Sequence, residues 1–300
     1  MTINHKNYTF LMQYQNEEKW RESFNSLTKK TYRFDFEKWY QSGYWDEGCL
    51  LYSLAEGDKV VSHVTVNVIR FTILGVEKKF VQLGTVMTDP DYRKQGLSRV
   101  LMEKVMLDWQ DHCDMIYLFA NDAVLDFYPK FGFVPVNEYQ AVYQLKAVKK
   151  GPAFRAMNMD NAGDRDLLFH TAQQAVPLFK ISMKDNAGLV MFYAHYFDRF
   201  SVSDFLYYIT DLNAVVVAEY EEEMLILHDI LAPATVDIKT VIHAMARENT
   251  SEVTLGFMPE NAEDYEISLH KEDNSTLFVQ AGCNKLFEDH QLIFPLLSHT

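Results

Sequence analysis

The side chains best suited to chemistry gather in a basic loop between a predicted strand and a predicted helix. An apolar run over residues 80–87 predicts the strand, and apolar residues spaced three and four apart from Leu97 to Met106 predict the helix. The first backbone N–H groups of a helix have no partner within the helix and carry the positive end of its dipole, so this junction suits an anion. Gly96 lets the backbone close on a phosphate. Because cationic charge surrounds the loop, the expected ligand is a diphosphate; the cations are Arg93, Lys94 and Arg99.

The spacing within this loop narrows the prediction. The sequence RKQGLS at residues 93–98 resembles the (Gln/Arg)-x-x-Gly-x-(Gly/Ala) loop of the GNAT N-acetyltransferases, whose backbone holds the pyrophosphate of acetyl-CoA. Ser98 replaces the usual Gly or Ala, which exchanges one small residue for another. The loop does not fit Walker A, which needs a Lys-Ser/Thr pair after its second glycine, nor the three-glycine dinucleotide fingerprint.

A second segment carries the same resemblance independently. Residues 121–133 (NDAVLDFYPKFGF) look like the Asn-x-x-Ala-x-x-(Phe/Leu)-Tyr-x-x-x-Gly-Phe segment of the family, with Val124 in the place of the usual Ala. The resemblance implies that Asn121 contacts the pantetheine or phosphate region and that Tyr128 is a catalytic residue facing the cofactor sulfur. The alternative for Tyr128 is a core aromatic beside Phe127, Phe131 and Phe133. The presence of both segments favours catalysis.

The resemblance implies acetyl-CoA as the cofactor and CoA as its product. In the family, pantetheine lies between two parallel strands that splay apart, here residues 81–87 and 115–119, and bonds the backbone like an added strand. The expected cofactor-binding residues are Val86, Met87, Thr88, Arg93, Lys94, Gln95, Gly96, Leu97, Ser98, Arg99 and Asn121.

The expected reaction is direct attack of a neutral amine on the thioester. A backbone N–H near Thr88 would polarise the carbonyl, and Tyr128 would protonate the sulfur. Many family members place a carboxylate base on the strand before the loop, but that strand here carries Gln82, Gly84 and Thr85. The candidates for the base, by residue type only, are His63, Glu47 and the terminal carboxylate of Thr300.

The elements that must position these residues follow the order of the GNAT fold. A hairpin over residues 49–68 is followed by the strand at 76–87, a crossover helix at 96–112 and a strand at 115–119. Two further apolar runs, at 135–136 and 139–145, are expected to complete this first sheet. The predicted fold class is α+β, with α/β-like character and a mixed central sheet flanked by helices.

Two predicted helices, near residues 17–24 and 35–41, form a region rich in aromatic residues. In the resembled family this region borders the acceptor site, so an aromatic-walled acceptor pocket is one interpretation. The other is ordinary packing, which we prefer for most of the eight aromatics. They are Trp20, Tyr32, Phe34, Phe36, Trp39, Tyr40, Tyr44 and Trp45.

A charged stretch ending in Gly151-Pro152 predicts a linker, with a catalytic domain at residues 1–148 and a second domain at 153–300. The second domain resembles a degenerate GNAT unit of the same element order. Its loop at residues 232–235 has neither glycine nor base, so we expect no acetyl-CoA there. Its predicted elements are helices at 164–175 and 236–246, a helical or irregular segment at 189–200, strands at 205–210, 214–219, 224–231 and 253–258, and a closing pair at 266–270 and 277–280.

The tandem arrangement is distantly similar to the enhanced-intracellular-survival type acetyltransferases, although the chain lacks the length for their third domain. The net charge of −14 lies in the second half: residues 1–150 hold 19 basic and 19 acidic residues, and residues 151–300 hold 9 and 23. Such a surface disfavours nucleic acid and anionic membrane and could attract a cationic amine, although solubility alone explains it.

Three cysteines far apart predict neither a disulfide framework nor a zinc site, and no metal is expected; they are Cys49, Cys113 and Cys283. Because no apolar run approaches a membrane span and the start lacks the apolar core of a signal peptide, the expected location is the cytoplasm.

The leading functional interpretation is an N-acetyltransferase that acetylates a primary amine of a small molecule or peptide, with aminoglycoside-like polyamines as one option. The alternatives are an acyl-CoA-binding regulatory protein and an interaction protein on a GNAT scaffold. The sequence leaves a homo-oligomer open.

Overall fold

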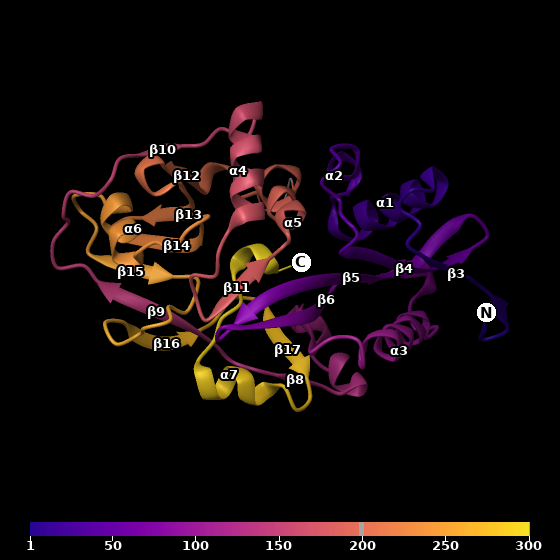
Figure 1. Cartoon of the computed structure of the whole chain (residues 1–300). Helices are drawn as coiled ribbons and strands as arrows, with labels where there is room; N and C mark the ends of the chain where they lie inside the picture. Colours follow the sequence, from indigo (N-terminus) through magenta and orange to yellow (C-terminus); the bar gives the residue numbers. More distant parts are fainter. Residues whose placement is uncertain (198–200, 300) are drawn as a thin grey trace.

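The computed structural model describes residues 1–197 and 201–299, which form two mixed sheets covered by helices (Figure 1). The first sheet contains, in spatial order, β3 (Thr9–Met12), β4 (Cys49–Glu56), β5 (Lys59–Ile73), β6 (Val76–Thr88), β7 (Met115–Ala120), β17 (Thr276–Gln280) and β8 (Phe133–Pro135), and β11 (Ile181–Lys184) pairs with β5. The second contains β10 (Phe154–Ala156), β12 (Leu206–Ile209), β13 (Ala214–Glu221), β14 (Met224–Leu231), β15 (Glu252–Leu255), β9 (Glu138–Gln144) and β16 (Glu266–His270).

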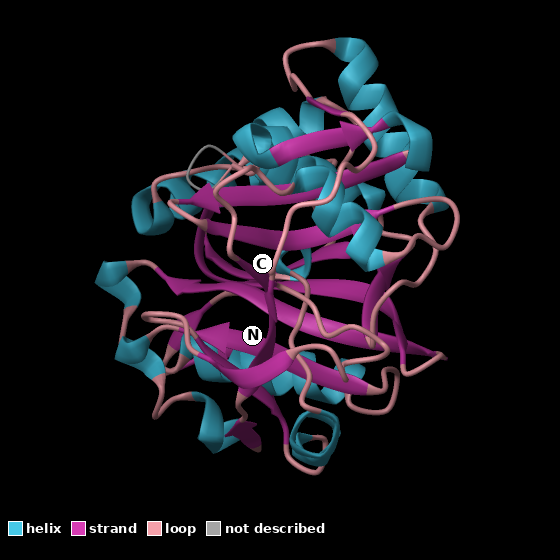
Figure 2. Ribbon diagram, turned by 90° about the vertical axis from the view of Figure 1, so that its left-hand side faces the viewer, coloured by secondary structure: helices cyan, strands magenta, loops and turns pink. Residues whose placement is uncertain are grey.

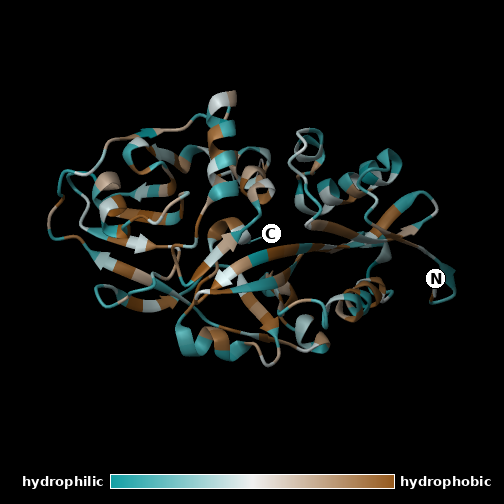
Figure 3. Ribbon diagram, in the orientation of Figure 1, coloured by the Kyte–Doolittle hydropathy of each residue, from teal (hydrophilic) through white to brown (hydrophobic). Residues whose placement is uncertain are grey.

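Helices cover both faces of the first sheet. The helices α1 (Glu18–Tyr32) and α2 (Glu37–Gln41) lie above it in Figure 1, and α3 (Leu97–Trp109) lies below. The alternation of apolar residues along β5 explains this arrangement, because Val64 and Val66 belong to the cluster that includes α3 whereas Ile69 and Phe71 face the cluster that includes α1. Hydrophobic residues concentrate along the strands of both sheets (Figure 3).

The second sheet repeats the central part of the first. The hairpin of β13 and β14 leads through α6 (Ile238–Met245) to β15, which pairs parallel with β14, as α3 connects β6 to the parallel β7. The remaining helices are α4 (Ala162–Gln174), α5 (Ala187–Met191) and α7 (Asn284–His290), and a short hairpin, β1 (Thr2–Ile3) with β2 (Lys6–Asn7), begins the chain. The predicted α+β class is confirmed, with mixed sheets flanked by helices and a second unit of similar element order. Viewed from the side, the strands of both sheets cross the middle of the molecule (Figure 2).

The two halves of the chain exchange strands. The run at residues 139–145 does not complete the first sheet, as expected from the sequence; it forms β9, which pairs with β15 and β16 in the second sheet. The predicted closing pair is also wrong, because β16 stays in the second sheet while β17 lies between β7 and β8 in the first. A hydrophobic pattern identifies a strand but does not identify the strand with which it pairs. The pairing depends on which open sheet edge the chain reaches. The division near residue 150 stays a proposal, and each sheet takes a strand from across it.

The boundaries of other predicted helices agree with the structure within a few residues. The predicted helices at 164–175 and 236–246 are α4 and α6, and the segment at 189–200 is α5 followed by a π-helix at Phe192–Tyr196, with 198–200 outside the described residues. Within the described chain, no helix is both long and apolar enough to span a membrane.

The carboxyl group of Glu138 is buried at the start of β9, where the chain passes from the first sheet to the second. Glu138 begins β9, and its Oε1 accepts the backbone N–H of Phe294 at 2.8 Å. Burial raises the pKa of this carboxyl to about 8; the bond from Phe294 opposes the rise, and the charge of Glu272 adds to it. The native state therefore binds a proton that the unfolded chain releases near pH 4.5.

We predict that Glu138→Gln removes a pH dependence of stability. In the parent, the stabilising effect of this bound proton is complete below about pH 4.5 and is lost as the pH rises to about 8. The free energy of unfolding of the variant should therefore match the parent near pH 5 and exceed it by on the order of 3 kcal/mol near pH 9. Urea denaturation across this range measures the difference. A difference that stays constant with pH would contradict the assignment.

Candidate functional site

The site begins where two parallel strands part. β6 and β7 pair at Phe80–Met115, Val81–Ile116 and Gln82–Tyr117, and within the described chain their pairing goes no further. Thr85 adopts a φ of 40°, and the register of β6 against β5 shifts between His63 and Thr65. Such a bulge bends a strand away from its neighbour. A cavity of about 730 Å³ fills the resulting gap and extends beyond it.

The open edge of β6 offers backbone donors to this gap. The N–H of Asp89 bonds the carbonyl of Val61 on β5 at 2.9 Å. Because N–H groups alternate in direction along a strand, those of Val86 and Thr88 point away from β5 and into the gap. The carbonyl of Val86 accepts the hydroxyl of Tyr32 at 3.0 Å.

The loop after β6 leaves the start of α3 open. Lys94 and Gly96 both have positive φ, 62° and 82°, and Gly96 is the N-cap residue of α3. In the described structure no side chain caps this end, so the first N–H groups of α3 are not occupied by a capping side chain. Gln95 fixes the shape of the loop instead, since its backbone carbonyl accepts the Asn4 amide at 2.7 Å and its side chain accepts the Tyr8 hydroxyl at 3.2 Å.

The corresponding helix of the second sheet, α6, has a capped N-terminus. Asp237 is the N-cap residue of α6, and its carboxylate accepts the N–H and the hydroxyl of Thr240. A negative charge therefore stands where the diphosphate would bind, in keeping with the absence of glycine and base at residues 232–235.

A buried ion pair anchors the entry to the loop. Asp89 is fully buried and lies 2.7 Å from the ammonium groups of both Lys30 and Lys59. Burial by itself would raise the pKa of this carboxyl, but the two ammonium groups and the N–H of Asp91 lower it to about 2. Asp89 is thus charged at neutral pH, and it ties the end of β6 to α1 and to β5.

The cavity collects seven of the predicted site residues: Val86, Met87, Thr88, Arg93, Ser98, Asn121 and Tyr128. The other five do not line it: Lys94, Gln95, Gly96, Leu97 and Arg99. Leu97 is buried in the core, and Lys94 and Arg99 are exposed. The Oδ1 of Asn121 accepts the N–H of Ala123 and caps the short helix that follows.

Tyr128 has the properties of a proton donor. Its side chain is buried at the cavity wall, and its hydroxyl finds no hydrogen-bond partner among the described residues. Burial raises the pKa of this phenol above its ordinary value, and the nearby Tyr32 adds to the effect. The group therefore stays protonated at neutral pH, with its proton free to bond a ligand.

A buried chain of hydrogen bonds reaches the cavity from the opposite side of β6. The Tyr14 hydroxyl meets Ser53 Oγ at 2.6 Å, Ser53 Oγ meets His63 Nδ1 at 2.8 Å, and His63 Nε2 meets Thr65 Oγ1 at 2.8 Å. Thr65 then bonds Thr85 Oγ1, and both threonines line the cavity.

The inner end of the chain fixes the direction of the bonds from Tyr14 to Thr65. Tyr14 is buried and has only Ser53 as a partner among the described residues, so its proton has nowhere else to go. Reversing the chain would leave this buried O–H unpaired, at a cost of about 1–3 kcal/mol. We infer that Tyr14 donates to Ser53, Ser53 to Nδ1 of His63, and Nε2–H to Thr65. In the last bond either threonine can donate; with Thr65 as the donor, the hydroxyl proton of Thr85 points into the cavity.

The structure does not favour any of the three residues that the sequence offered as the general base. Burial lowers the pKa of His63 to about 3, so its ring is neutral, and its donor nitrogen faces Thr65. Glu47 is exposed and does not line the cavity. The carboxylate of Thr300 lies outside the described residues. Within those residues, no group of three or more His, Cys, Asp or Glu side chains could hold a metal ion.

Aromatic side chains from both halves of the chain wall the far end of the cavity. From the first half come Tyr32, Phe34, Phe36 and Trp39, and from the α5 region come Phe192, Tyr193 and Phe197 together with the aliphatic Leu189. The rings of Phe36 and Phe192 stack at 5.4 Å, and Phe34 meets Phe197 edge to face at 4.8 Å. We call this end the aromatic chamber. Trp39 also donates its indole N–H to the carbonyl of Gly188 at 3.0 Å, which joins the two walls.

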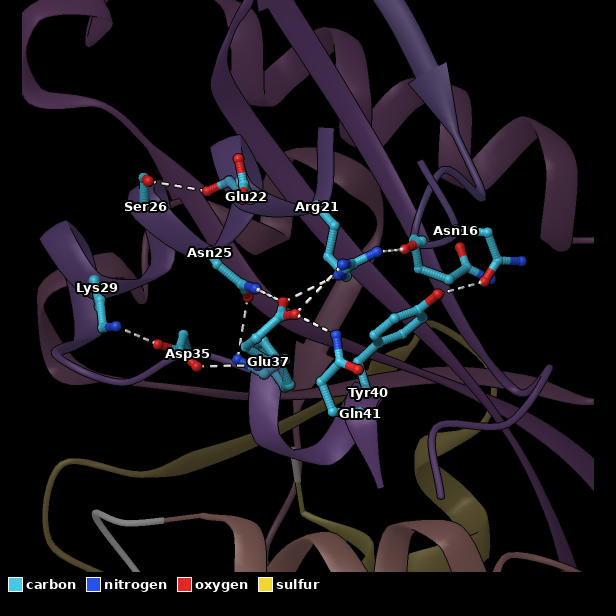
Figure 4. A network of polar contacts seen from close by, with 12 residues as sticks. Asn16, Arg21, Glu22, Asn25, Ser26, Lys29, Asp35, Glu37, Tyr40 and Gln41 are labelled. Carbon is cyan, nitrogen blue, oxygen red and sulfur yellow. Dashed lines mark hydrogen bonds and ion pairs between the residues drawn. The ribbon is translucent and has the colours of Figure 1, made fainter. Parts of the chain in front are cut away.

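A polar network fixes the first wall (Figure 4). Arg21 holds both carboxylate oxygens of Glu37, at 3.0 and 3.3 Å, and Asn25 donates to the same carboxylate at 2.9 Å. The side chain of Asn25 also accepts the backbone N–H of Phe36 at 3.1 Å. This network sets the connection between α1 and α2, which carries Phe34 and Phe36 into the chamber.

Sequence reasoning missed part of this site. Four of the eight early aromatics line the cavity, although packing was the interpretation preferred for most of them. The second wall has no motif at all, and the wall loop at Asn274 and Ser275 comes from the strand exchange. The only sequence feature that drew attention to Thr85 was its place on the strand before the loop, where many members of the family carry a carboxylate.

Comparison with known proteins supports the resemblance carried by the two motifs. Residues 13–133 match the model of the acetyltransferase (GNAT) family. No curated protein matches the sequence.

Solved structures extend the likeness to the second half. A probable N-acyltransferase from Enterococcus faecalis V583 is 12% identical over 95% of this chain and 75% of its own, with a TM-score of 0.58. A GCN5-related N-acetyltransferase from Kribbella flavida is 14% identical over 91% and 71%, with a TM-score of 0.57. Eis1 from Mycobacterium abscessus is 14% identical over 90% and 72%, with a TM-score of 0.56. At these identities the shared feature is the fold, which agrees with the tandem resemblance.

The direction of the buried chain makes a spectroscopic prediction. In protein labelled with 15N histidine, His63 should carry its proton on Nε2 and stay neutral from pH 8 down to about pH 4, because burial holds its pKa near 3. A His63→Asn variant identifies the signal by its loss. A proton on Nδ1 would show that the chain runs the other way, and a titration midpoint near pH 6.5 would contradict the burial of the ring.

Proposed function

We propose that the protein is an acetyl-CoA-dependent N-acetyltransferase that acetylates a primary amine by direct attack. The observation that carries the proposal is the continuous cavity, which runs from the open start of α3, along the parted edge of β6, to the aromatic chamber. An acyl-CoA molecule is an extended ligand with an anionic end and a reactive end, and the cavity presents suitable groups in that order.

The residues present fit the cofactor from one end to the other. Arg93 and the first N–H groups of α3 suit the diphosphate, and the loop glycine keeps a side chain away from it. The N–H groups of Val86 and Thr88 suit the amide groups of pantetheine, which would bond them as an added strand. When bound, acetyl-CoA supplies an activated acyl group on sulfur.

The chain's own residues then have distinct tasks. Thr85, oriented by the buried chain, donates its hydroxyl proton to the carbonyl oxygen of the thioester, where negative charge grows. Tyr128 gives its proton to the departing sulfur and regains one from water. The walls of the aromatic chamber hold the amine beside the reacting carbon and exclude bulk water.

Arg93→Ala tests the cofactor half of the proposal. Removing a charge-assisted bond to phosphate should weaken binding of acetyl-CoA and of CoA by about 1–3 kcal/mol, which isothermal titration calorimetry measures. Arg99→Ala is the matched control, because Arg99 carries the same charge on the first turn of α3 but does not line the cavity. The control should lose much less affinity. No binding to the parent at millimolar cofactor would overturn the proposal.

Tyr128→Phe tests the chemical half. The variant should bind CoA almost as the parent does, while kcat falls by about 10²–10⁴ with any amine that the parent accepts. Release of free thiol reports the rate. If CoA binds tightly but neither the parent nor the variant acetylates an amine, the result would favour an acyl-CoA-binding regulatory protein over an enzyme. Full turnover by the variant would mean that the thiolate takes its proton from elsewhere.

A further inference from the structure

The aromatic chamber contains a feature that restricts the acceptor. Among the described residues that line the whole cavity, Arg93 is the only charged side chain, and it lies at the cofactor end. Within these residues, no carboxylate reaches the chamber, so the acidic surplus of the second half does not extend to this part of the site. The sequence-based idea of a polyamine drawn in by acidic residues therefore has no counterpart in the chamber.

We propose that the acceptor is a small primary monoamine with an apolar, ring-sized body, such as an arylalkylamine, and this proposal rests on the proposed acetyltransferase function. Phe34 and Phe36 are in direct contact with Phe192 and Phe197, and these rings together form one continuous aromatic wall of the chamber. A flat apolar body gains offset or edge-to-face contacts with such rings. The second half of the chain therefore selects the acceptor, although it carries none of the expected cofactor-binding residues.

A polyamine is disfavoured by the cost of burying charge. Each additional ammonium group that enters loses its hydration, and a buried charge without a partner costs several kcal/mol. An aminoglycoside carries several such groups, whereas a monoamine carries one, at its reacting end. The cavity volume of about 730 Å³ must also accommodate the cofactor arm, which leaves room for a small molecule.

The same apolar surroundings explain how the reaction proceeds without a carboxylate base. Burial in a weakly polar site favours the neutral form of an amine, so it lowers the pKa of the bound ammonium group. The acceptor reaches the chamber as the free amine after releasing a proton to water. Its nitrogen forms a bond to the acyl carbon as the carbon–sulfur bond breaks, and the nitrogen loses one further proton to water. Because Tyr128 protonates the sulfur, the products are an amide and a free thiol.

The test compares 2-phenylethylamine with spermidine and kanamycin. The first should be acetylated with a kcat/KM at least about 100-fold higher than either polyamine, which is the ratio that an unpaired charge costing about 3 kcal/mol gives. Calorimetry of 2-phenylethylamine with CoA-saturated protein should detect binding without any turnover, and spermidine should give none.

Two variants of one wall residue sharpen the test. Phe34→Glu places a carboxylate in the chamber and should reduce kcat/KM for 2-phenylethylamine by about tenfold or more while raising that for spermidine. Phe34→Leu keeps the wall apolar and should keep the preference for the monoamine. CoA affinity, measured on both variants, should stay near that of the parent because Phe34 belongs to the other end of the cavity.

The outcomes separate this inference from the proposed function. The inference is supported if the parent prefers the monoamine and Phe34→Glu weakens that preference. Tight CoA binding with a preference for polyamines, or with no transfer to 2-phenylethylamine, overturns the inference and leaves the cofactor site in place. Loss of both CoA binding and turnover in the parent would overturn the proposed function itself.

Discussion

The parting of β6 from β7 is the constraint on which the rest of the site depends. Parallel strands normally continue their pairing, so an open edge inside a sheet leaves backbone groups without partners. The bulge at Thr85 produces this opening, and the buried chain behind it holds the threonine in a conformation that a β-branched residue rarely adopts. Strain, orphaned donors and a polar chain thus occur at one point of one strand. Their coincidence is what makes the gap a site for a ligand that can pair as a strand.

The strand exchange gives the second half a role in this site. β17 supports the outer side of β7, so the strand that forms one wall of the gap is held by a segment that lies far along the chain, with Thr276 paired to Ala120. The same half supplies α5 and the π-helix after it, a rare element that is frequent at functional sites. Close approach is built into this contact, because a Cβ atom on Gly188 would lie 2.3 Å from the carbonyl oxygen of Tyr44. The second half therefore contributes directly to the walls of the cavity.

The sequence predicted the parts of this structure that local chemistry determines. Gly96 and the basic residues around it define a loop, Tyr128 sits in a spaced motif, and the strands and helices near them follow from the periodicity of apolar residues. Partners far apart in the chain could not be predicted in this way. Nothing local distinguishes β9 from a strand of the first sheet, and nothing in Phe192 reveals that it stacks on Phe36. Thr85 illustrates the same limit, because its role depends on a chain that begins at Tyr14, across two other strands.

The central claim is that an acyl-CoA lies in the gap between β6 and β7 with its sulfur toward Tyr128. A crystal structure of the protein with CoA and 2-phenylethylamine tests it most directly. The account predicts diphosphate at the start of α3, pantetheine amides bonded to the N–H groups of Val86 and Thr88, and the sulfur within hydrogen-bond reach of the Tyr128 hydroxyl. CoA bound at any other surface, or a gap closed by continued pairing of β6 with β7, would contradict it.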